Sequence, residues 1–316
     1  MTPLMQAATS SGLPTTAPAP VIVLEGESSF LRTRAEVLRE YAEWYRERIG
    51  IDGPPWRGAA LPRAAAISHS GGRRVWRLAP GPGEGPATIL KVERPPLPGI
   101  LRRLISRSAA EREFRNLQSL RALGFPAVEP IAHGQQGFGP LRLRTFLVTR
   151  DFEGSISLRQ WTRAERRPIP REEIEGLLLA LAPALATLHR GGGAIQTLLA
   201  KNILVRRGTG GAAELALCDV PRFIPAGAGR FLFRHAVRDL ATLDKWASTA
   251  IDGSVRREFL RTYIASLGLM KASRRELIHG ILGSVDRMEH RTPMGRLSLA
   301  IKTVLRRLHL EQFWPF

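Results

Sequence analysis

Two residues in the second half of the chain have the types and the spacing of a metal site. Residues 199–223 predict a strand, a glycine turn, a second strand and a loop. Asn202 stands where the first strand opens, and Asp219 where the second strand closes. Amide and carboxylate oxygens are hard ligands for a divalent cation such as Mg²⁺. A hairpin that holds these two side chains together predicts a metal site of the kind that accompanies the phosphates of a nucleotide.

A lysine and a glutamate earlier in the chain could serve the same chemistry. Lys91 lies in the middle of an apolar strand, ATILKVERP, where an unpaired ammonium group would be costly. The next helix carries Glu111 and Glu113, and Glu113 can point sideways from that helix's apolar stripe. A strand lysine held by a helix glutamate can present its charge to phosphate groups. The alternative is that Lys91 extends its ammonium to solvent from the edge of a sheet.

The elements that must position these residues predict an α+β fold with a sheet-rich first half and a helix-rich second half. Strands are expected at AAAISHS and RRVWRL around a glycine turn, at ATILKVERP, and as a pair at 128–133 and 143–150. Helices are expected at 108–124, with Ser108 as its cap, and at 171–190, 234–250, 253–266, 273–288 and 294–309.

The expected organisation has four parts. Residues 1–20, rich in Pro, Thr and Ala, are expected to be a disordered tail. Residues 21–62 are expected to be an N-terminal helical extension, whose helix is capped by Ser28 or Ser29 and runs to about Ile49. Residues 63–150 form the sheet lobe with one helix, and residues 151–316 form the helical lobe.

Composition limits the classes of function. The net charge is +19, and most of the 47 basic residues are arginines spread along the chain. This pattern favours a compositional bias or an anionic partner, such as a membrane surface or a phosphorylated glycan, over nucleic acid. A single cysteine, Cys218, excludes an intramolecular disulfide framework. No run is long and apolar enough to span a membrane, and the N-terminus lacks the pattern of a signal peptide, so we expect a cytoplasmic protein.

The ordered series of strand lysine, helix glutamate, Asn and Asp resembles the protein-kinase-like superfamily. Within it, the chain is most similar to the bacterial lipopolysaccharide core kinases, which phosphorylate Kdo or heptose sugars. The resemblance covers roughly residues 63–266 and rests on ILKVERP, AEREFRNLQSLRALGFPAVEPIAHG, LVTRDFEGSISLRQW, LLALAPALATLHRGG, AKNILV, LCDVPRF and RDLATLDKW. It implies a two-lobed protein-kinase-like fold, with an antiparallel-sheet N-lobe and a helical C-lobe.

The resemblance also implies roles for single residues. Lys91 matches the phosphate-contacting lysine and Glu113 its helix partner. Asn202 and Asp219 match the two metal ligands, which implies ATP and Mg²⁺ as cofactors. Phe152 and Glu153 fall in the segment that meets the adenine through backbone groups, and Asp239 matches a structural Asp that braces the catalytic loop.

The chain departs from the family's pattern at the catalytic base. Kinases place an Asp five residues before the metal-binding Asn, and here that position is Thr197, with Ile195 where a His is usual. His189 lies at the wrong distance to replace it, and SHSGGRRVW favours a plain hairpin turn over a full glycine-rich loop. Lys201, beside Asn202, could stabilise a transferred phosphate or lie solvated.

Three functions therefore remain open. The first is a pseudokinase or impaired kinase that binds ATP and Mg²⁺ and could bind a glycan or lipid-linked sugar, or a protein partner. The second is an active ATP-dependent phosphotransferase that acts on a sugar hydroxyl of the lipopolysaccharide core. The third is a protein unrelated to kinases that binds an anionic surface. The basic amphipathic C-terminal stretch, from Gly295, could lie on the anionic inner membrane or dock on the helical lobe.

Overall fold

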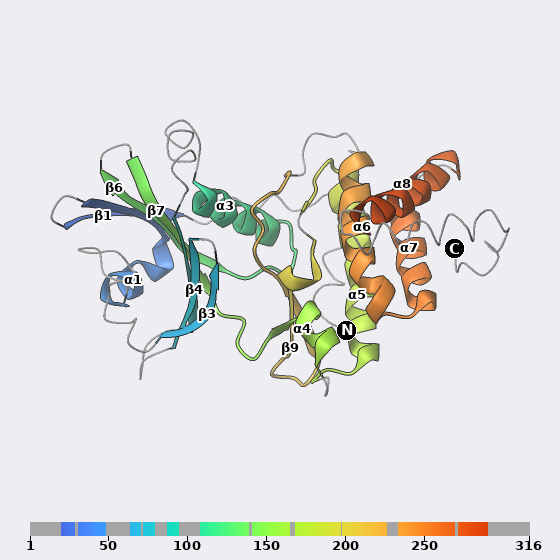
Figure 1. Cartoon of the computed structure of the whole chain (residues 1–316), viewed down its shortest axis with the longest axis horizontal. Coiled ribbons are helices and arrows are strands. Elements are labelled where there is room, and N and C mark those ends of the chain that lie inside the picture. Colours follow the sequence, from blue (N-terminus) through green and yellow to red (C-terminus); the bar gives the residue numbers. More distant parts are fainter. Residues whose placement is uncertain are drawn as a thin grey trace. The chain divides into compact units, whose positions relative to one another are not determined.

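The computed structural model describes residues 20–28, 31–48, 64–70, 72–79, 87–94, 108–138, 141–164, 168–196, 198–225, 233–268 and 271–289. The chain divides into two compact units. The sheet unit is formed by Pro14–Gly154 together with Ala216–Arg222, and the helical unit contains Ser155–Leu215 and the residues from Phe223 onward. The α+β fold class predicted from the sequence is confirmed by a unit built on an antiparallel sheet and a unit built mainly of helices (Figure 1).

The sheet unit contains a seven-stranded antiparallel sheet in the order β1-β2-β6-β7-β5-β4-β3. Its strands are β1 (Val21–Ser28), β2 (Leu31–Leu38), β3 (Ala64–Ser70), β4 (Arg73–Leu78), β5 (Thr88–Glu93), β6 (Pro130–Phe138) and β7 (Leu141–Arg150). The hairpin and the third strand predicted from residue 63 onward are confirmed as β3, β4 and β5. The later strand pair is confirmed as β6 and β7.

The N-terminal part of this unit corrects one prediction. The helical extension predicted from about residue 30 begins instead as strands β1 and β2, and among the described residues between 20 and 48 only η2 (Arg39–Tyr41) and α1 (Ala42–Arg48) are helical. Strand β2 pairs with β6, and its alternate residues Ala35 and Val37 are buried. Apolar residues at Leu31, Ala35 and Leu38 also fit a helical period, so a local pattern did not distinguish the two structures. Pairing with a distant strand decided the outcome.

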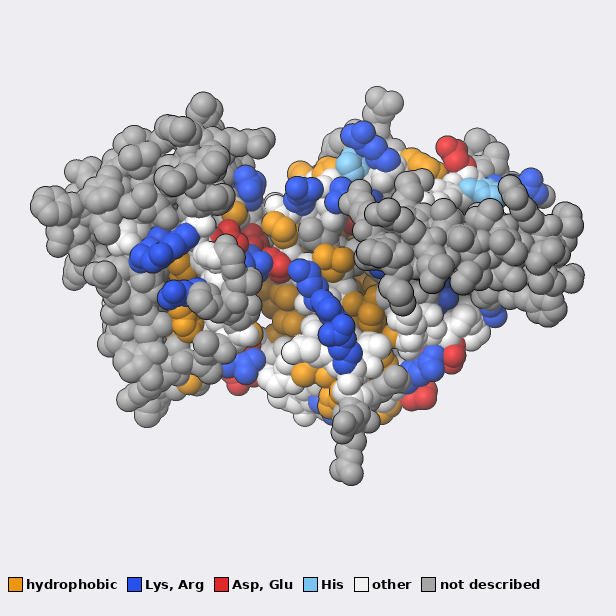
Figure 2. Space-filling model, in the orientation of Figure 1, with side chains coloured by type: hydrophobic (Ala, Val, Ile, Leu, Met, Phe, Trp, Pro, Cys, Tyr) orange, Lys and Arg blue, Asp and Glu red, His pale blue; other side chains and the backbone are white. Residues whose placement is uncertain are grey.

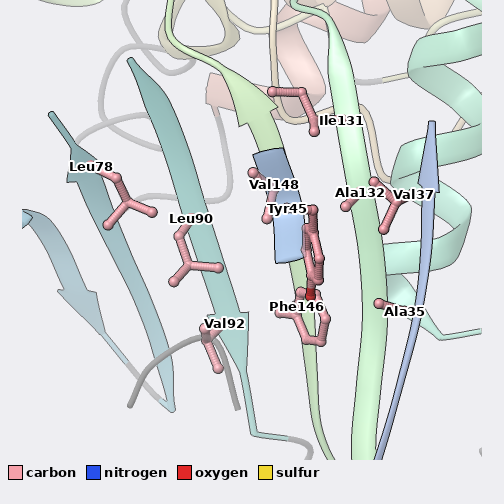
Figure 3. Close-up of a cluster of buried hydrophobic side chains, with 10 residues drawn as sticks. All are labelled: Ala35, Val37, Tyr45, Leu78, Leu90, Val92, Ile131, Ala132, Phe146 and Val148. Atoms are coloured by element: carbon pink, nitrogen blue, oxygen red, sulfur yellow. The ribbon is translucent and has the colours of Figure 1, made fainter. Parts of the chain in front are cut away.

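The two faces of the seven-stranded sheet pack against different elements. On one face, Tyr45 of α1 packs in an apolar core (Figure 3) with residues of five strands, namely Ala35, Val37, Leu78, Leu90, Val92, Ile131, Ala132, Phe146 and Val148. Against the sheet lies α3 (Ala109–Ala122), which contacts β6 and β7. Because side chains alternate along a strand, Leu90 and Val92 enter the core while Lys91 points to the opposite face.

The helical unit contains most of the helices predicted for the second half. They are α4 (Leu158–Arg163), α5 (Arg171–Arg190), α6 (Phe233–Ala250), α7 (Gly253–Leu267) and α8 (Lys271–Glu289). Helix α5 packs against α7, and α6 packs against α8 (Figure 1). A small sheet has the order β10-β9-β8, with β8 (Ile156–Ser157), β9 (Ile203–Arg207) and β10 (Ala213–Leu217).

Three expectations concern other parts of the chain or its surface. The tail at 1–20, except Pro20, and the helix expected at 294–309 lie outside the described residues, as does the C-terminal stretch from Gly295. Of the helices that are described, none has the length and apolarity needed to span a bilayer. Basic side chains of the described residues are scattered over the face shown in Figure 2, as the even spread of arginines along the sequence leads one to expect.

Candidate functional site

Lys91 is held on the α3 side of the sheet by its place in β5. It pairs with Val75 of β4 and Leu147 of β7, so strands flank it on both sides. The residue is 9% exposed. Its Nζ donates to a carboxylate oxygen of Glu113 and to Oδ1 of Asp219 at 3.0 Å. The expectation that a mid-strand lysine needs a carboxylate partner is therefore confirmed, and the alternative of a solvated ammonium is wrong.

Glu113 is positioned by helix α3. The helix begins where Ser108 Oγ accepts a hydrogen bond from the Glu111 backbone N–H at 3.0 Å, as its sequence predicted. Its apolar stripe is buried, and the ring of Phe114 lies 4.7 Å from that of His133 on β6. This packing fixes the rotation of the helix about its axis. Glu113, next to Phe114, is only 4% exposed and meets Lys91.

Asp219 follows β10 in a short segment that belongs to the sheet unit. Leu217 donates its N–H to the Pro126 carbonyl and accepts from the Val128 N–H, while Asn116 Nδ2 of α3 donates to the Val220 carbonyl at 2.8 Å. The backbone of Asp219 has φ of 51°, in the left-handed region that residues other than glycine seldom adopt. Hydrogen bonds of Leu217 and Val220, on either side of Asp219, thus hold its backbone in this strained conformation and its carboxylate beside Lys91.

Two further residues of this cluster were not singled out from the sequence. Arg73 Nη2 lies 3.3 Å from Asp219 Oδ1, and Arg73 Nε lies 3.8 Å from Glu93 Oε1. Glu93 Oε1 is also 3.7 Å from Lys91 Nζ. Arg73 and Glu93 are register partners in the β4–β5 ladder, two residues from Val75 and Lys91. Glu93 lies two residues after Lys91, and Arg73 directly follows the Gly72 turn, so knowledge of the β4–β5 register would have indicated both residues.

The electrostatics of the cluster shift the pKa values of its buried groups. Burial outweighs Lys91 at Glu113 and raises the pKa of that carboxyl. Burial alone would lower the pKa of Lys91, but Glu113 and Asp219 outweigh it and raise that pKa above its usual value. Burial alone would raise the pKa of Asp219, but Lys91 and Arg73 outweigh it and hold that pKa below its usual range. Burial, with help from Asp219 and Glu113, raises the pKa of the Cys218 thiol to about 12. Cys218 is therefore protonated and poorly reactive.

The connector after β7 carries Phe152 and Glu153. It is tied to the sheet unit by the Asp151 N–H, which donates to the Ala87 carbonyl at 2.8 Å, and by Asp151 Oδ2, which lies 2.7 Å from Arg77 Nε. Phe152 is half-buried and Glu153 is exposed. Their contact with an adenine ring stays a prediction.

In the helical unit, Asp239 of α6 braces the loop that follows α5. Its Oδ2 accepts the Ile195 backbone N–H at 2.8 Å and lies 3.2 Å from His189 Nε2. His189 Nδ1 lies 2.7 Å from the Tyr263 hydroxyl. One neutral tautomer satisfies both contacts, with Nε2–H donating to Asp239 and Nδ1 accepting from Tyr263. His189 is 1% exposed, so it acts as a buried structural group, and the loop keeps the brace that the resemblance implied for Asp239.

Comparison with known proteins identifies the family. The model of the lipopolysaccharide kinase (Kdo/WaaP) family matches residues 99–263, more than half of the 316-residue chain. The chain belongs to the lipopolysaccharide kinase (Kdo/WaaP) family. The family inferred from the ordered motifs is thereby confirmed.

Individual relatives of this family member are distant. The lipopolysaccharide core heptose(I) kinase WaaP of Pseudomonas aeruginosa is 27% identical over 162 residues, which are 49% of this chain and 59% of that protein. The match thus spans about three fifths of the length of the relative. Among solved structures, WaaP in complex with acyl carrier protein has a TM-score of 0.49 at 22% identity, covering 71% of this chain and 86% of that chain. The kinase domain of Mycobacterium tuberculosis PknI, as a mutant, has a TM-score of 0.37 at 15% identity, covering 61% and 84%.

The residues predicted for the site of this lipopolysaccharide kinase family member fall into three groups. Lys91, Glu113 and Asp219 lie together in the sheet unit. Asn202 is buried at the end of η5 (Ala200–Asn202) in the helical unit, beside the exposed Lys201. Thr197 lies outside the described residues. Within the described ranges, no three His, Cys, Asp or Glu side chains gather in a group that could hold a metal by themselves.

Proposed function

We propose that this chain binds ATP and Mg²⁺ as a kinase-like protein of the lipopolysaccharide kinase family, with phosphoryl transfer impaired. The observation that carries the proposal is the buried contact of Lys91 with both Glu113 and Asp219. Lys91 would bind the nucleotide phosphates, and Glu113 would orient it. Phe152 and Glu153 would border the adenine through their backbone groups.

The donor set at Asp219 fits a divalent cation. Asp219 is a carboxylate with a lowered pKa, and the two cations on its Oδ1 mark a site of negative potential. A metal bound with a nucleotide needs few protein ligands, because phosphate oxygens supply the others. We propose Asp219 as one ligand and Asn202 as the second, as the resemblance to kinases implies. When bound, the metal would neutralise charge on the phosphates.

The proposed impairment rests on the residue at the position of the catalytic base. Thr197 stands five residues before Asn202, where kinases carry Asp. A positioned general base contributes about 10²–10⁴ in rate. The remainder of phosphoryl transfer depends on positioning and charge neutralisation, for which Lys91 and Asp219 remain.

The alternative is an active ATP-dependent phosphotransferase. The contact of Asp239 with the Ile195 N–H favours it, because the loop that should hold the acceptor hydroxyl keeps its internal support. In both cases the proposed acceptor or ligand is a sugar of the lipopolysaccharide core, by analogy with the family. The charge of +19 suits an anionic glycolipid at the inner membrane. An impaired kinase would act through a protein partner.

Direct titration with a fluorescent ATP analogue tests nucleotide binding. We expect saturable, Mg²⁺-dependent binding to the wild type and a loss of at least about tenfold in Lys91→Ala and Asp219→Asn, since each removes a charge-assisted contact. Arg74→Gln is the matched control, because Arg74 is an exposed cation on β4, one residue from the cluster. Titration below the melting temperature of each variant separates lost binding from lost folding. Absence of binding in the wild type would reject the proposal.

Phosphotransfer from radiolabelled ATP to lipid A–core acceptors separates impaired from active kinase. The impaired reading predicts little transfer by the wild type and a gain in Thr197→Asp, of up to about 10²-fold or more. Transfer by the wild type that equals or exceeds that of Thr197→Asp would establish the active alternative instead.

A further inference from the structure

Arg73 is held in the charge cluster by backbone structure. Gly72, immediately before it, has φ of 83°, which favours glycine, and its carbonyl accepts the Arg94 N–H at 2.9 Å. Arg73 then enters the β4–β5 ladder opposite Glu93. A hydrogen bond and a register pair thus fix the backbone on which the Arg73 side chain stands, at the turn between β3 and β4.

The far end of the same side chain is held less firmly. The Arg73 side chain is 36% exposed, and its contacts to Asp219 and Glu93 are 3.3 and 3.8 Å long. The Lys91 side chain, by contrast, is 10% exposed and makes a closer contact with the same Asp219 oxygen, at 3.0 Å. Ion pairs at this degree of exposure contribute little to stability, so the Arg73–Asp219 contact can be exchanged for another at small cost.

The charges of the cluster favour such an exchange. Two cations, Arg73 and Lys91, face three carboxylates, those of Glu93, Glu113 and Asp219. A divalent cation on Asp219 would add two positive charges beside the guanidinium and repel it. Phosphate groups, which bring negative charge to the same place, are good partners for the planar fork of arginine.

We propose that Arg73 is a counter-ion that a divalent metal displaces from Asp219, and that it then binds the phosphates of the incoming nucleotide. The inference rests on the proposed nucleotide site and adds to it a cation outside the Lys91–Glu113 pair. Without metal, the Arg73 guanidinium pairs with the Asp219 carboxylate, so it competes for that carboxylate with a metal ion that binds in the absence of nucleotide. With nucleotide present, it contributes to affinity.

Opposite effects on two dissociation constants test this exchange. The first is that of Mn²⁺ alone, used in place of Mg²⁺ because free Mn²⁺ is read directly by electron paramagnetic resonance. The second is that of a fluorescent ATP analogue in saturating Mn²⁺. Removal of the competing cation in Arg73→Gln should tighten Mn²⁺ binding by about 3- to 10-fold, and removal of the phosphate contact should weaken nucleotide binding by about 5- to 30-fold. Arg74→Gln should change both constants by less than about twofold, as a general field effect would.

Each outcome bears on a separate claim. The proposed exchange of Arg73 for metal would be overturned if both dissociation constants were unchanged in Arg73→Gln or shifted in the same direction. It would also be overturned if Arg74→Gln shifted them equally. Nucleotide binding by the wild type would stand in each of these cases. A wild type that binds no nucleotide rejects the proposed function, and with it the phosphate role of Arg73. Arg73→Lys keeps the charge without the fork, so its nucleotide affinity should fall between wild type and Arg73→Gln. Thermal melts of all variants exclude a folding defect.

Discussion

Removal of the Lys91 ammonium should destabilise the sheet unit through the carboxylate that it leaves behind. In Lys91→Met, Asp219 and Glu93 keep contacts with Arg73, but Glu113, at 4% exposure, loses the Lys91 ammonium. Breaking a buried pair in this way costs about 3–5 kcal/mol. The cost has a limit, because Glu113 can take up a proton.

The stability of Lys91→Met should depend on pH, because the cost of the unpaired Glu113 carboxylate cannot exceed the cost of protonating it. Protonating an ordinary glutamate with a pKa near 4.3 costs about 3.7 kcal/mol at pH 7 and about 1.6 kcal/mol at pH 5.5, at 1.36 kcal/mol per unit. In the variant, the folded-state pKa of Glu113 lies above its unfolded value, so the native state binds more protons than the unfolded state. Stability therefore rises as the pH falls, by up to about 1.4 kcal/mol per unit, between the folded and the unfolded pKa. In the wild type the Lys91 ammonium opposes the effect of burial on the pKa of Glu113, so the slope there should be smaller than in Lys91→Met.

Hydrogen exchange of the α3 amides measures the effect within the sheet unit, without requiring that the two units unfold together. The cycle comprises Lys91→Met, Glu113→Met and the double variant. The double variant has no buried unpaired charge, so it should recover at least about 2 kcal/mol relative to Lys91→Met at pH 7. Glu111→Gln, which removes a partly exposed pair with Arg115 on the same helix, is the control and should cost less than about 1 kcal/mol. Equal losses at pH 5.5 and pH 7, or additive losses in the double variant, would refute the reasoning.

Two further predictions concern the packing of the sheet unit and its thiol. Gly134→Ala should lower the free energy of unfolding by about 1–3 kcal/mol, because a Cβ there would collide with the Arg34 carbonyl and the Phe146 ring. Urea unfolding measures this loss, and Gly210→Ala, which has open space around its Cβ position, is the control. Equal losses in the two variants would contradict the packing argument. Cys218, with a pKa of about 12, should react with iodoacetamide at pH 8 on the order of 1,000-fold more slowly in the native than in the urea-unfolded chain. Mass spectrometry measures both rates, and comparable rates would contradict the raised pKa of this thiol.

Features that depend on nearby residues were predictable from the sequence. Helix α3 follows from the Ser108 cap and an apolar period, both of which lie within the helix itself. The need of Lys91 for a carboxylate follows from the cost of burying a charge, which requires only that the strand be buried. Family membership followed from the order of several weak motifs, and it was confirmed by the match over residues 99–263.

Features that depend on distant pairing were not predictable in this way. Residues 31–38 fit a helical period, but pairing with β6, about a hundred residues later, makes them strand β2. Arg73 was visible as a residue after a glycine turn, but its contact with Asp219 joins positions 146 residues apart. The bonds from Asn116 and Pro126 that hold the Asp219 segment are equally non-local. The sequence thus indicated which groups carry charge, and the register determined which of them meet.

Stability alone is a poor reason for the sheet unit to keep five charges together. Buried ion pairs are often no more stable than apolar residues of similar volume. If the cluster serves no ligand, the Lys91→Met/Glu113→Met variant would match or exceed the wild type in stability and bind Mn²⁺-nucleotide and inorganic phosphate no differently from the wild type. If it serves a ligand, that variant would be equally stable but would bind neither Mn²⁺-nucleotide nor inorganic phosphate at wild-type affinity. Because the two explanations agree on folding and differ only on binding, one stability measurement and one titration of the double variant decide between them.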